Sequence, residues 1–335
     1  MTALPGRIAR ISGALLLVLT VAALFGLVSG PAAGWPRAFS ALLGWGEDDT
    51  LRRIIFRLRM PRVAAAGLVG GALSMGGLAF QALLRNPLAE PYILGLSGGA
   101  GVGAVMAIGA GLARFPGVCL AAFAGAMGVL VLVLALVPGA NRAAATGAFR
   151  ERLLLSGVMV NAFCGAVILA LVALTSDERL HAVLFWLMGD LSGMDGRSAW
   201  ILGGMVVPFS IGVILLAHPM NLLLLGRETA QTSGVSVGRI SLLLMTLTSL
   251  LVGATVAFCG LIGFVGLVVP HLLRLLFGPD HRVLAPAALL GGGAFLMVCD
   301  TLARTLPRNG EMPTGVVTAL VGAPLFIYFL RRNAP

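Results

Sequence analysis

Long runs of residues without a charged side chain constrain this chain more than any other feature of its sequence. The longest run, 240–273, holds 34 residues between two arginines. A helix that crosses the hydrocarbon core of a bilayer needs about 20 consecutive apolar residues. Charged residues make up only 11% of the chain, whereas a soluble domain has about 25%. The sequence therefore excludes an ordinary soluble protein, a disordered chain and a disulfide-stapled scaffold.

The apolar runs predict an all-α membrane protein in which residues 1–335 form a single transmembrane domain. The run 240–273 is too long for one ordinary helix, and a cluster of glycines at Gly260, Gly263 and Gly266 favours a break within it. Small residues at four-residue spacing, such as Gly67 and Gly71, predict closely packed helices. Ten transmembrane helices are expected, at about 11–29, 63–83, 92–112, 115–137, 153–175, 198–217, 240–258, 262–277, 283–303 and 314–330.

The sequence contains no lysine, so all 23 of its basic residues are arginine. A P-loop needs a lysine that reaches the phosphates of the nucleotide. We therefore expect no Walker-type ATP site and no bound cofactor on this chain. The arginines are scattered between apolar runs, which indicates the ends of membrane helices in contact with the lipid bilayer and not a nucleic-acid partner.

The residues that usually carry catalysis or bind metals are isolated in this sequence. The four cysteines lie singly within apolar runs, and no two of the four histidines have ligand spacing. Asp300 is the one carboxylate inside an expected helix, whereas ion-coupled carriers usually need several ionisable groups in the membrane. We therefore expect no enzyme active site and no metal site, and the single intramembrane carboxylate counts against a proton-coupled secondary transporter.

The placement of the arginines indicates how the chain is oriented in the membrane. Ten helices put both termini on one side. Taking that side as the cytoplasm places twelve arginines inside and eleven outside. Six of the eleven lie in one loop, 34–62, and the remaining arginines favour the inside. We therefore expect both termini to be cytoplasmic. The six arginines of the loop 34–62 depart from this rule, so we expect a specific cause for their position on the outer side.

Two arginine motifs lie at the expected outer ends of helices. Arg59 and Arg62 are three residues apart at a helix start and share one face. A cation at a helix N-terminus is unfavourable by about 0.3–1 kcal/mol, so the pair indicates an external acidic partner. Snorkelling towards lipid headgroups is the alternative. Asp300 and Arg304 have the four-residue spacing of an intrahelical ion pair.

The longest polar stretch on the expected cytoplasmic side is 226–239, between two apolar runs. It has the pattern of a short polar helix that ends at Gly234. A docking element for a partner and a merely solvated loop are both compatible with this pattern.

Five motifs together resemble the permease subunits of type II ATP-binding-cassette importers, the FecCD-type family that takes up iron-siderophores, haem and cobalamin. They follow the family order over nearly the whole chain. The matching stretches are Leu58-Arg-Met-Pro-Arg62, Asn86-Pro-Leu-Ala-Glu-Pro91, Gly263-Phe-Val-Gly-Leu-Val-Val-Pro-His-Leu-Leu-Arg274, Asp280-His-Arg282 and Pro313-Thr-Gly-Val-Val-Thr-Ala-Leu-Val-Gly-Ala-Pro324.

The resemblance implies a homodimer, two separate ATPase subunits on the cytoplasmic face and an extracytoplasmic substrate-binding protein. Arg59, Arg62 and Arg304 match arginines that receive glutamates of that binding protein. The segment 226–238 matches the coupling helices that dock on the ATPase, with Gly226, Arg227, Glu228, Thr229, Ala230, Gln231 and Gly234 as the contact residues. The positions that match a cytoplasmic gate are Asn86, Leu88, Arg150 and Glu151.

The resemblance implies a transporter subunit that is not an enzyme and takes part in ATP-driven import across the bacterial inner membrane. ATP and Mg²⁺ would bind only to the partner ATPase. A proton-coupled secondary transporter is the alternative from another class. The expected cargo is an iron chelate, either a siderophore complex or haem, and cobalamin is the alternative. His181 lies on the expected outer side before a membrane helix and is the candidate contact with the substrate.

Overall fold

The computed structural model describes residues 4–30, 34–45, 48–137, 147–307 and 310–332. All regular structure in these residues is helical, in agreement with the expected fold class. Seven helices are long and apolar enough to cross a membrane, judged by length and composition. They are α1 (Leu4–Val28), α4 (Met60–Leu84), α6 (Cys119–Leu136), α8 (Gly147–Ala173), α10 (Gly196–Leu215), α13 (Val237–Cys259) and α15 (His281–Thr305).

Three further apolar helices are shorter, and several small helices join the long ones. The shorter apolar helices are α5 (Leu96–Gly109), α14 (Val265–Phe277) and α16 (Thr314–Arg332). The connecting helices are α2 (Trp35–Leu43), α3 (Asp49–Arg53), η1 (Ile54–Arg59), η2 (Arg114–Val118), α9 (Asp177–Leu187), α11 (Ala217–Leu225) and α12 (Arg227–Thr232).

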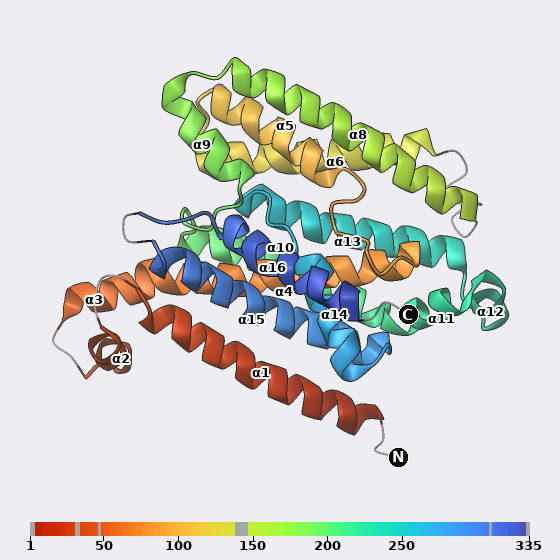
Figure 1. Cartoon of the computed structure of the whole chain (residues 1–335), viewed down its shortest axis with the longest axis horizontal. Helices are drawn as coiled ribbons and strands as arrows, with labels where there is room; N and C mark the ends of the chain where they lie inside the picture. The colour runs from red at the N-terminus through yellow and green to blue at the C-terminus, as the bar shows by residue number, and fades with distance from the viewer. Residues whose placement is uncertain (1–3, 31–33, 46–47, 138–146, 308–309, 333–335) are drawn as a thin grey trace.

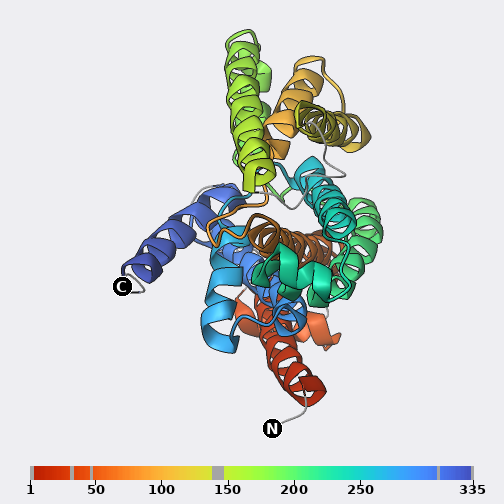
Figure 2. The same ribbon diagram turned by 90° about the vertical axis from the view of Figure 1, so that its right-hand side faces the viewer.

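The helices lie side by side and give the molecule two distinct ends (Figure 1). One end carries α2, α3 and α9, and we call it the α9 end. The other carries α11, α12 and both labelled chain termini, and we call it the α12 end. In both views α5, α6 and α8 form a group on one side of the molecule, and α1 lies on the opposite side (Figure 2).

Helix α4 forms the centre of the bundle, where it packs against α10, α13, α14 and α15. Its residues are buried along nearly its whole length. Gly70 of α4 faces Gly292 of α15 so closely that a Cβ on either residue would collide with the carbonyl oxygen of the other. Gly99 of α5 and Gly125 of α6 show the same reciprocal approach. The expectation of closely packed helices is confirmed, because only residues without a Cβ allow this backbone contact.

The break expected within 240–273 is confirmed between Cys259 and Val265, the residues that end α13 and begin α14. Gly260 has φ 70° and Phe264 has φ 68°, and this left-handed conformation does not continue a right-handed helix. The helix expected at 92–112 is shorter in the structure, spanning Leu96–Gly109. The preceding residues form turns, with hydrogen bonds from Ile93 to Glu90 and from Gly95 to Tyr92.

Candidate functional site

The three arginines singled out from the sequence meet at the α9 end, although they come from separate elements. Arg59 ends η1, Arg62 lies in the first turn of α4, and Arg304 lies in the last turn of α15. They are only 6%, 6% and 7% exposed, respectively. The sequence did not reveal that all three would be buried. Long-range packing against α1 and α15 covers them.

Asp300 is the centre of this arginine cluster. Its carboxylate accepts hydrogen bonds from Nε of Arg62 at 3.0 and 3.2 Å and from the hydroxyl of Thr314 at 2.9 Å. Nε of Arg304 lies 3.2 Å from the same carboxylate, but it is not aligned for a hydrogen bond. The expected ion pair of Asp300 with Arg304 is thus present, and the pair with Arg62 adds a contact across 238 residues that sequence spacing could not reveal.

Two of the arginines also bind the C-terminal end of α1. Arg59 donates to the carbonyl oxygens of Leu27 and Val28 at 2.9 and 3.2 Å, and Arg304 donates to that of Gly26 at 3.0 Å. The last carbonyl groups of a helix have no partner within the helix and carry partial negative charge. Helix α1 therefore supplies complementary charge to Arg59 and Arg304 from within the chain, which the sequence pattern did not reveal.

A cavity of about 560 Å³ opens beside the arginine cluster. Glu311 lines it and also pairs with Arg62, at 2.5 Å from Nη1. Sequence reasoning missed Glu311, and its only signal was its position two residues before the Pro313 motif. The other residues around the cavity are Phe25, Ser29, Gly30, Trp35, Arg304, Thr305, Pro307 and Gly310.

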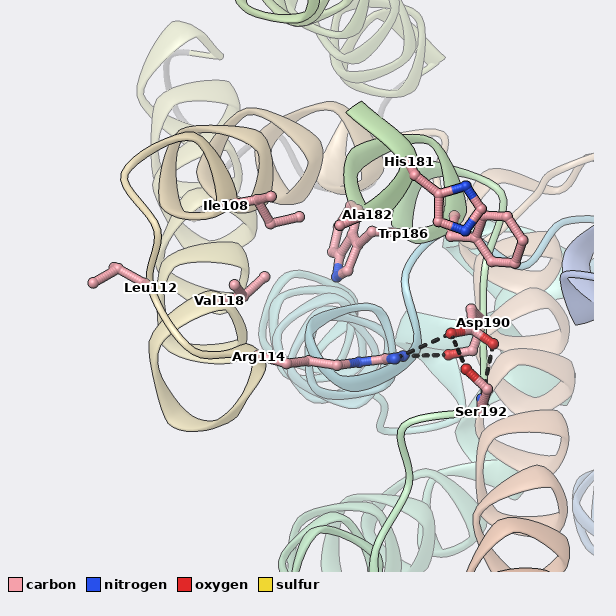
Figure 3. A pocket seen from close by; sticks show the side chains of 10 residues that line it. Ile108, Leu112, Arg114, Val118, His181, Ala182, Trp186, Asp190 and Ser192 are labelled. Carbon is pink, nitrogen blue, oxygen red and sulfur yellow. Dashed lines mark hydrogen bonds and ion pairs between the residues drawn. The ribbon is translucent and has the colours of Figure 1, made fainter. Parts of the chain in front are cut away.

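His181 lines a second cavity at the same end, of about 390 Å³ (Figure 3). Its imidazole is exposed and lies 4.2 Å from the ring of Phe185, measured between centroids. In the same cavity Arg114 of η2 reaches Asp190, with 3.0 Å to the carboxylate and 2.7 Å to the backbone oxygen. Burial alone would raise the pKa of Asp190, but hydrogen bonds from Ser192 and the charge of Arg114 outweigh it and hold that pKa below its usual value.

The segment 226–238 lies at the α12 end and contains one short helix, α12, whereas more than one coupling helix was expected. Its chain turns at Gly234, which has φ 82°, and α13 begins at Val237. Ala230 is fully buried, and its carbonyl oxygen accepts from the amide of Val235 at 2.9 Å. The exposed residues of this segment include Glu228, Thr229 and Gln231. The side chain of Arg227 lies outside the described residues, and Gly226 has φ 122° at the start of α12.

The residues expected to form a gate lie on two segments. Asn86 and Leu88 belong to the turn after α4, where the side-chain oxygen of Asn86 accepts from the amide of Leu88 at 2.9 Å. Glu151 is exposed near the start of α8, and the side chain of Arg150 lies outside the described residues. Contact between the two segments at these positions stays a prediction.

Leu88 also borders a cavity of about 600 Å³ that the sequence did not reveal. Asn161 of α8 faces this cavity, and its side-chain oxygen accepts from the hydroxyl of Ser97 on α5 at 3.4 Å. A polar amide within the apolar run 153–176 was the available signal. The remaining lining residues are Glu90, Tyr92, Ile93, Val158, Ala162, Leu267 and Phe326.

Residues 15–332 match the FecCD transport family. The chain belongs to this family. It is 42% identical over 301 residues to the cobalamin import system permease protein BtuC of Halobacterium salinarum, covering 89% of this chain and 79% of that protein. It is 37% identical over 326 residues to the hemin transport system permease protein HmuU of Yersinia pestis, covering 96% and 95%.

The fold of this FecCD-family chain agrees with solved structures. An ABC transporter of metal-chelate type in an inward-facing conformation superimposes with a TM-score of 0.85 and 29% identity, over 97% of this chain and 99% of that one. PsaBC from Streptococcus pneumoniae superimposes with a TM-score of 0.55 at 15% identity, over 87% and 94%, which shows a shared fold alone.

The FecCD-family chain is thus the permease subunit of a type II ABC importer and a multi-pass membrane protein. It is not an enzyme, because ATP hydrolysis in such importers takes place on a separate subunit. A proton-coupled secondary carrier, the alternative from another class, is therefore wrong. Family membership also implies an ATPase, a substrate-binding protein and a dimer of permeases as partners.

Proposed function

We propose that this permease imports a metal chelate across the inner membrane, with an iron chelate (a siderophore complex or haem) as the cargo. Similarity to a hemin permease over 96% of this chain supports the iron chelate. Cobalamin is the second candidate, and 42% identity to the cobalamin permease of Halobacterium salinarum supports it. Both cargoes are large rigid complexes with the metal already ligated, and shape and weak contacts suffice to guide them.

The proposed path lies between two copies of the chain and is lined in part by α8 and α16. The cavity of about 600 Å³ supports it, because Asn161 of α8 and Phe326 of α16 both border that space. Both helices also expose large apolar side chains, including Leu155, Phe163, Leu320 and Ile327. A homodimer in which these faces approach each other would cover apolar surface that a single copy leaves open to lipid.

The proposed orientation puts the α9 end outside and both termini in the cytoplasm. The binding protein then docks at the arginine cluster of Arg59, Arg62 and Arg304. His181 lies at the same outer end, where it would meet an incoming chelate. Three arginines face only two carboxylates among the described residues of this cluster, and the surplus positive charge favours an acidic partner.

At the α12 end, two ATPase subunits would dock on the homodimer, one on each copy of the segment 226–238. The exposed polar residues of α12 support this assignment, because they stand clear of the helix bundle. ATP and Mg²⁺ would bind only to the ATPase. Hydrolysis would then switch the bundle between two packings and move the gate formed by Asn86, Leu88, Arg150 and Glu151.

The cargo is tested by measuring ATP hydrolysis of the complex reconstituted with its ATPase and binding protein. A ferric siderophore, haem and cobalamin are supplied in parallel at equal concentration. We expect an iron chelate to stimulate hydrolysis and to accumulate in proteoliposomes. Stimulation and uptake with cobalamin alone would make the second candidate correct, and uptake of none of the three would contradict both.

His181 is tested in the same proteoliposomes with the variant His181→Ala. If the imidazole contacts haem, the variant lowers haem uptake and leaves basal ATP hydrolysis unchanged. The matched control is His218→Ala, which alters a histidine near the α12 end. Equal haem uptake by both variants and the wild type would remove His181 from the substrate path.

A further inference from the structure

Glu311 already forms an ion pair with Arg62, one of the three arginines proposed for docking. Its carboxylate lies 2.5 Å from Nη1 of Arg62, and 46% of its side chain is exposed at the α9 end. Arg62 itself is buried. Glu311 touches Arg62 on one side and lines the cavity of about 560 Å³ on the other. An external group that approaches Arg62 from this cavity therefore meets Glu311 first.

Three donors close to the cavity lack a hydrogen-bond partner among the described residues. Ser29 and Arg304 both line it. The hydroxyl of Ser29 and Nε of Arg304 are buried and have no hydrogen-bond partner among the described residues, and the same holds for Nη2 of Arg62. A buried donor without a partner is unfavourable. An acidic side chain that enters the cavity would lie beside Ser29 and Arg304, where the positive charge of the cluster attracts it.

The two carboxylates of the cluster are held very differently. Asp300 is fully buried, pairs with both Arg62 and Arg304, and accepts from Thr314. Glu311 is half-exposed, and Arg62 is its one ion-pair partner among the residues that the structure describes. Replacing Glu311 by an external carboxylate would leave the net charge of the cluster unchanged, whereas replacing Asp300 would expose a buried group.

We propose that Glu311 is an internal competitor for the docking carboxylate. An acidic side chain of the extracytoplasmic binding protein displaces Glu311 from Arg62, so that Arg62 exchanges one carboxylate for another. This inference rests on the proposed docking role of Arg62. Glu311 lies three residues before Thr314, the first residue of α16. Release of Glu311 from Arg62 would therefore act on the start of α16, a helix that lines the proposed path.

The test measures the affinity of the binding protein for the complex in nanodiscs. The probe is the binding protein that stimulates ATP hydrolysis of the reconstituted complex. Glu311→Gln removes the competing charge and should raise the affinity about threefold to fivefold, since an exposed ion pair is worth up to about 1 kcal/mol. Arg62→Gln should lower it at least about tenfold. Glu178→Gln, which removes an exposed carboxylate from α9, is the control and should change nothing.

The outcomes separate this inference from the docking proposal. An unchanged affinity in Arg62→Gln would contradict docking at Arg62. A lower affinity in Arg62→Gln, together with a wild-type or lower affinity in Glu311→Gln, would overturn the partner exchange alone. If Glu311→Gln does not assemble, Glu311→Asp replaces it. This variant keeps the charge but shortens the side chain by one methylene, so a smaller gain in affinity is expected and the lack of any gain overturns the exchange.

Discussion

The guanidinium of Arg304 and the carbonyl oxygen of Gly26 lie 3.0 Å apart, although 278 residues separate them in the chain. Arg59 makes the equivalent contact with Leu27 and Val28. Helix α1 lies at the edge of the bundle and has few buried residues of its own. Besides its packing against α15, its C-terminal end is held by two cations that satisfy its last carbonyl groups.

Replacing Arg304 should loosen this attachment. Arg304→Gln removes the charge that pairs with Asp300 and weakens the bond to Gly26. We expect the free energy of unfolding to fall by about 1.5–3 kcal/mol, the range for hydrogen bonds that involve charged groups. Thermal unfolding in detergent measures the change. Arg37→Gln on α2 is the control, because Arg37 is exposed, and equal melting temperatures of the two variants would contradict the proposed role.

The contact of Gly70 with Gly292 predicts that even one added methyl group is harmful in the middle of α4. Gly70→Ala places a Cβ against the carbonyl oxygen of Gly292, so α4 and α15 must move apart at a cost of about 1–3 kcal/mol. In Gly204→Ala the new Cβ meets no atom within 4 Å, and the better helix propensity of alanine should make this variant as stable as the wild type or more so. Melting temperatures of the two variants in detergent give the comparison, and a stable Gly70→Ala would refute the close approach.

Asp190 should make stability depend on pH. Its pKa is lowered from the usual 3.8 in the folded chain, so the folded state binds the proton more weakly than the unfolded state. The stabilisation from Arg114 and Ser192 is therefore complete above about pH 4 and disappears as the pH falls through the lowered pKa. We expect Asp190→Asn to unfold at a lower temperature than the wild type at pH 7, and the difference to shrink towards pH 3.

The control for this pH series is Asp177→Asn, which alters an exposed carboxylate at the same end. The melting temperatures of the wild type and both variants are measured from pH 7 to pH 3. A difference between Asp190→Asn and the wild type that stays constant over the whole range would mean that the charge of Asp190 contributes nothing.

Glu228 tests the proposed contact with the ATPase. Glu228→Arg reverses an exposed charge on α12 and should dissociate or uncouple the ATPase while the helix bundle remains folded. Copurification of the ATPase and substrate-stimulated ATP hydrolysis are measured for this variant and for Glu178→Arg, the same change at the opposite end. Normal copurification and transport by Glu228→Arg would show that the contact lies elsewhere.

The sequence by itself determined the membrane character of the protein and much of its helix pattern. Uncharged runs long enough to cross a bilayer predict helices, because a helix satisfies the hydrogen bonds of its own backbone N–H and C=O groups in lipid. The break near Gly260 and the close helix packing also follow from local residue types. The complete absence of lysine excludes a P-loop nucleotide site on this chain, because that motif needs a lysine amine that reaches the phosphates.

Only the tertiary structure decided what the arginines touch. The spacing of Asp300 and Arg304 predicted one ion pair, but the contacts of Asp300 with Arg62 and of Arg304 with Gly26 join helices that are far apart in the chain. Helix periodicity gives the face on which a residue lies and not the helix that this face will meet. The partner of each buried charge is set by packing, since a charge in the bundle is stable only where an opposite charge or a free carbonyl group reaches it.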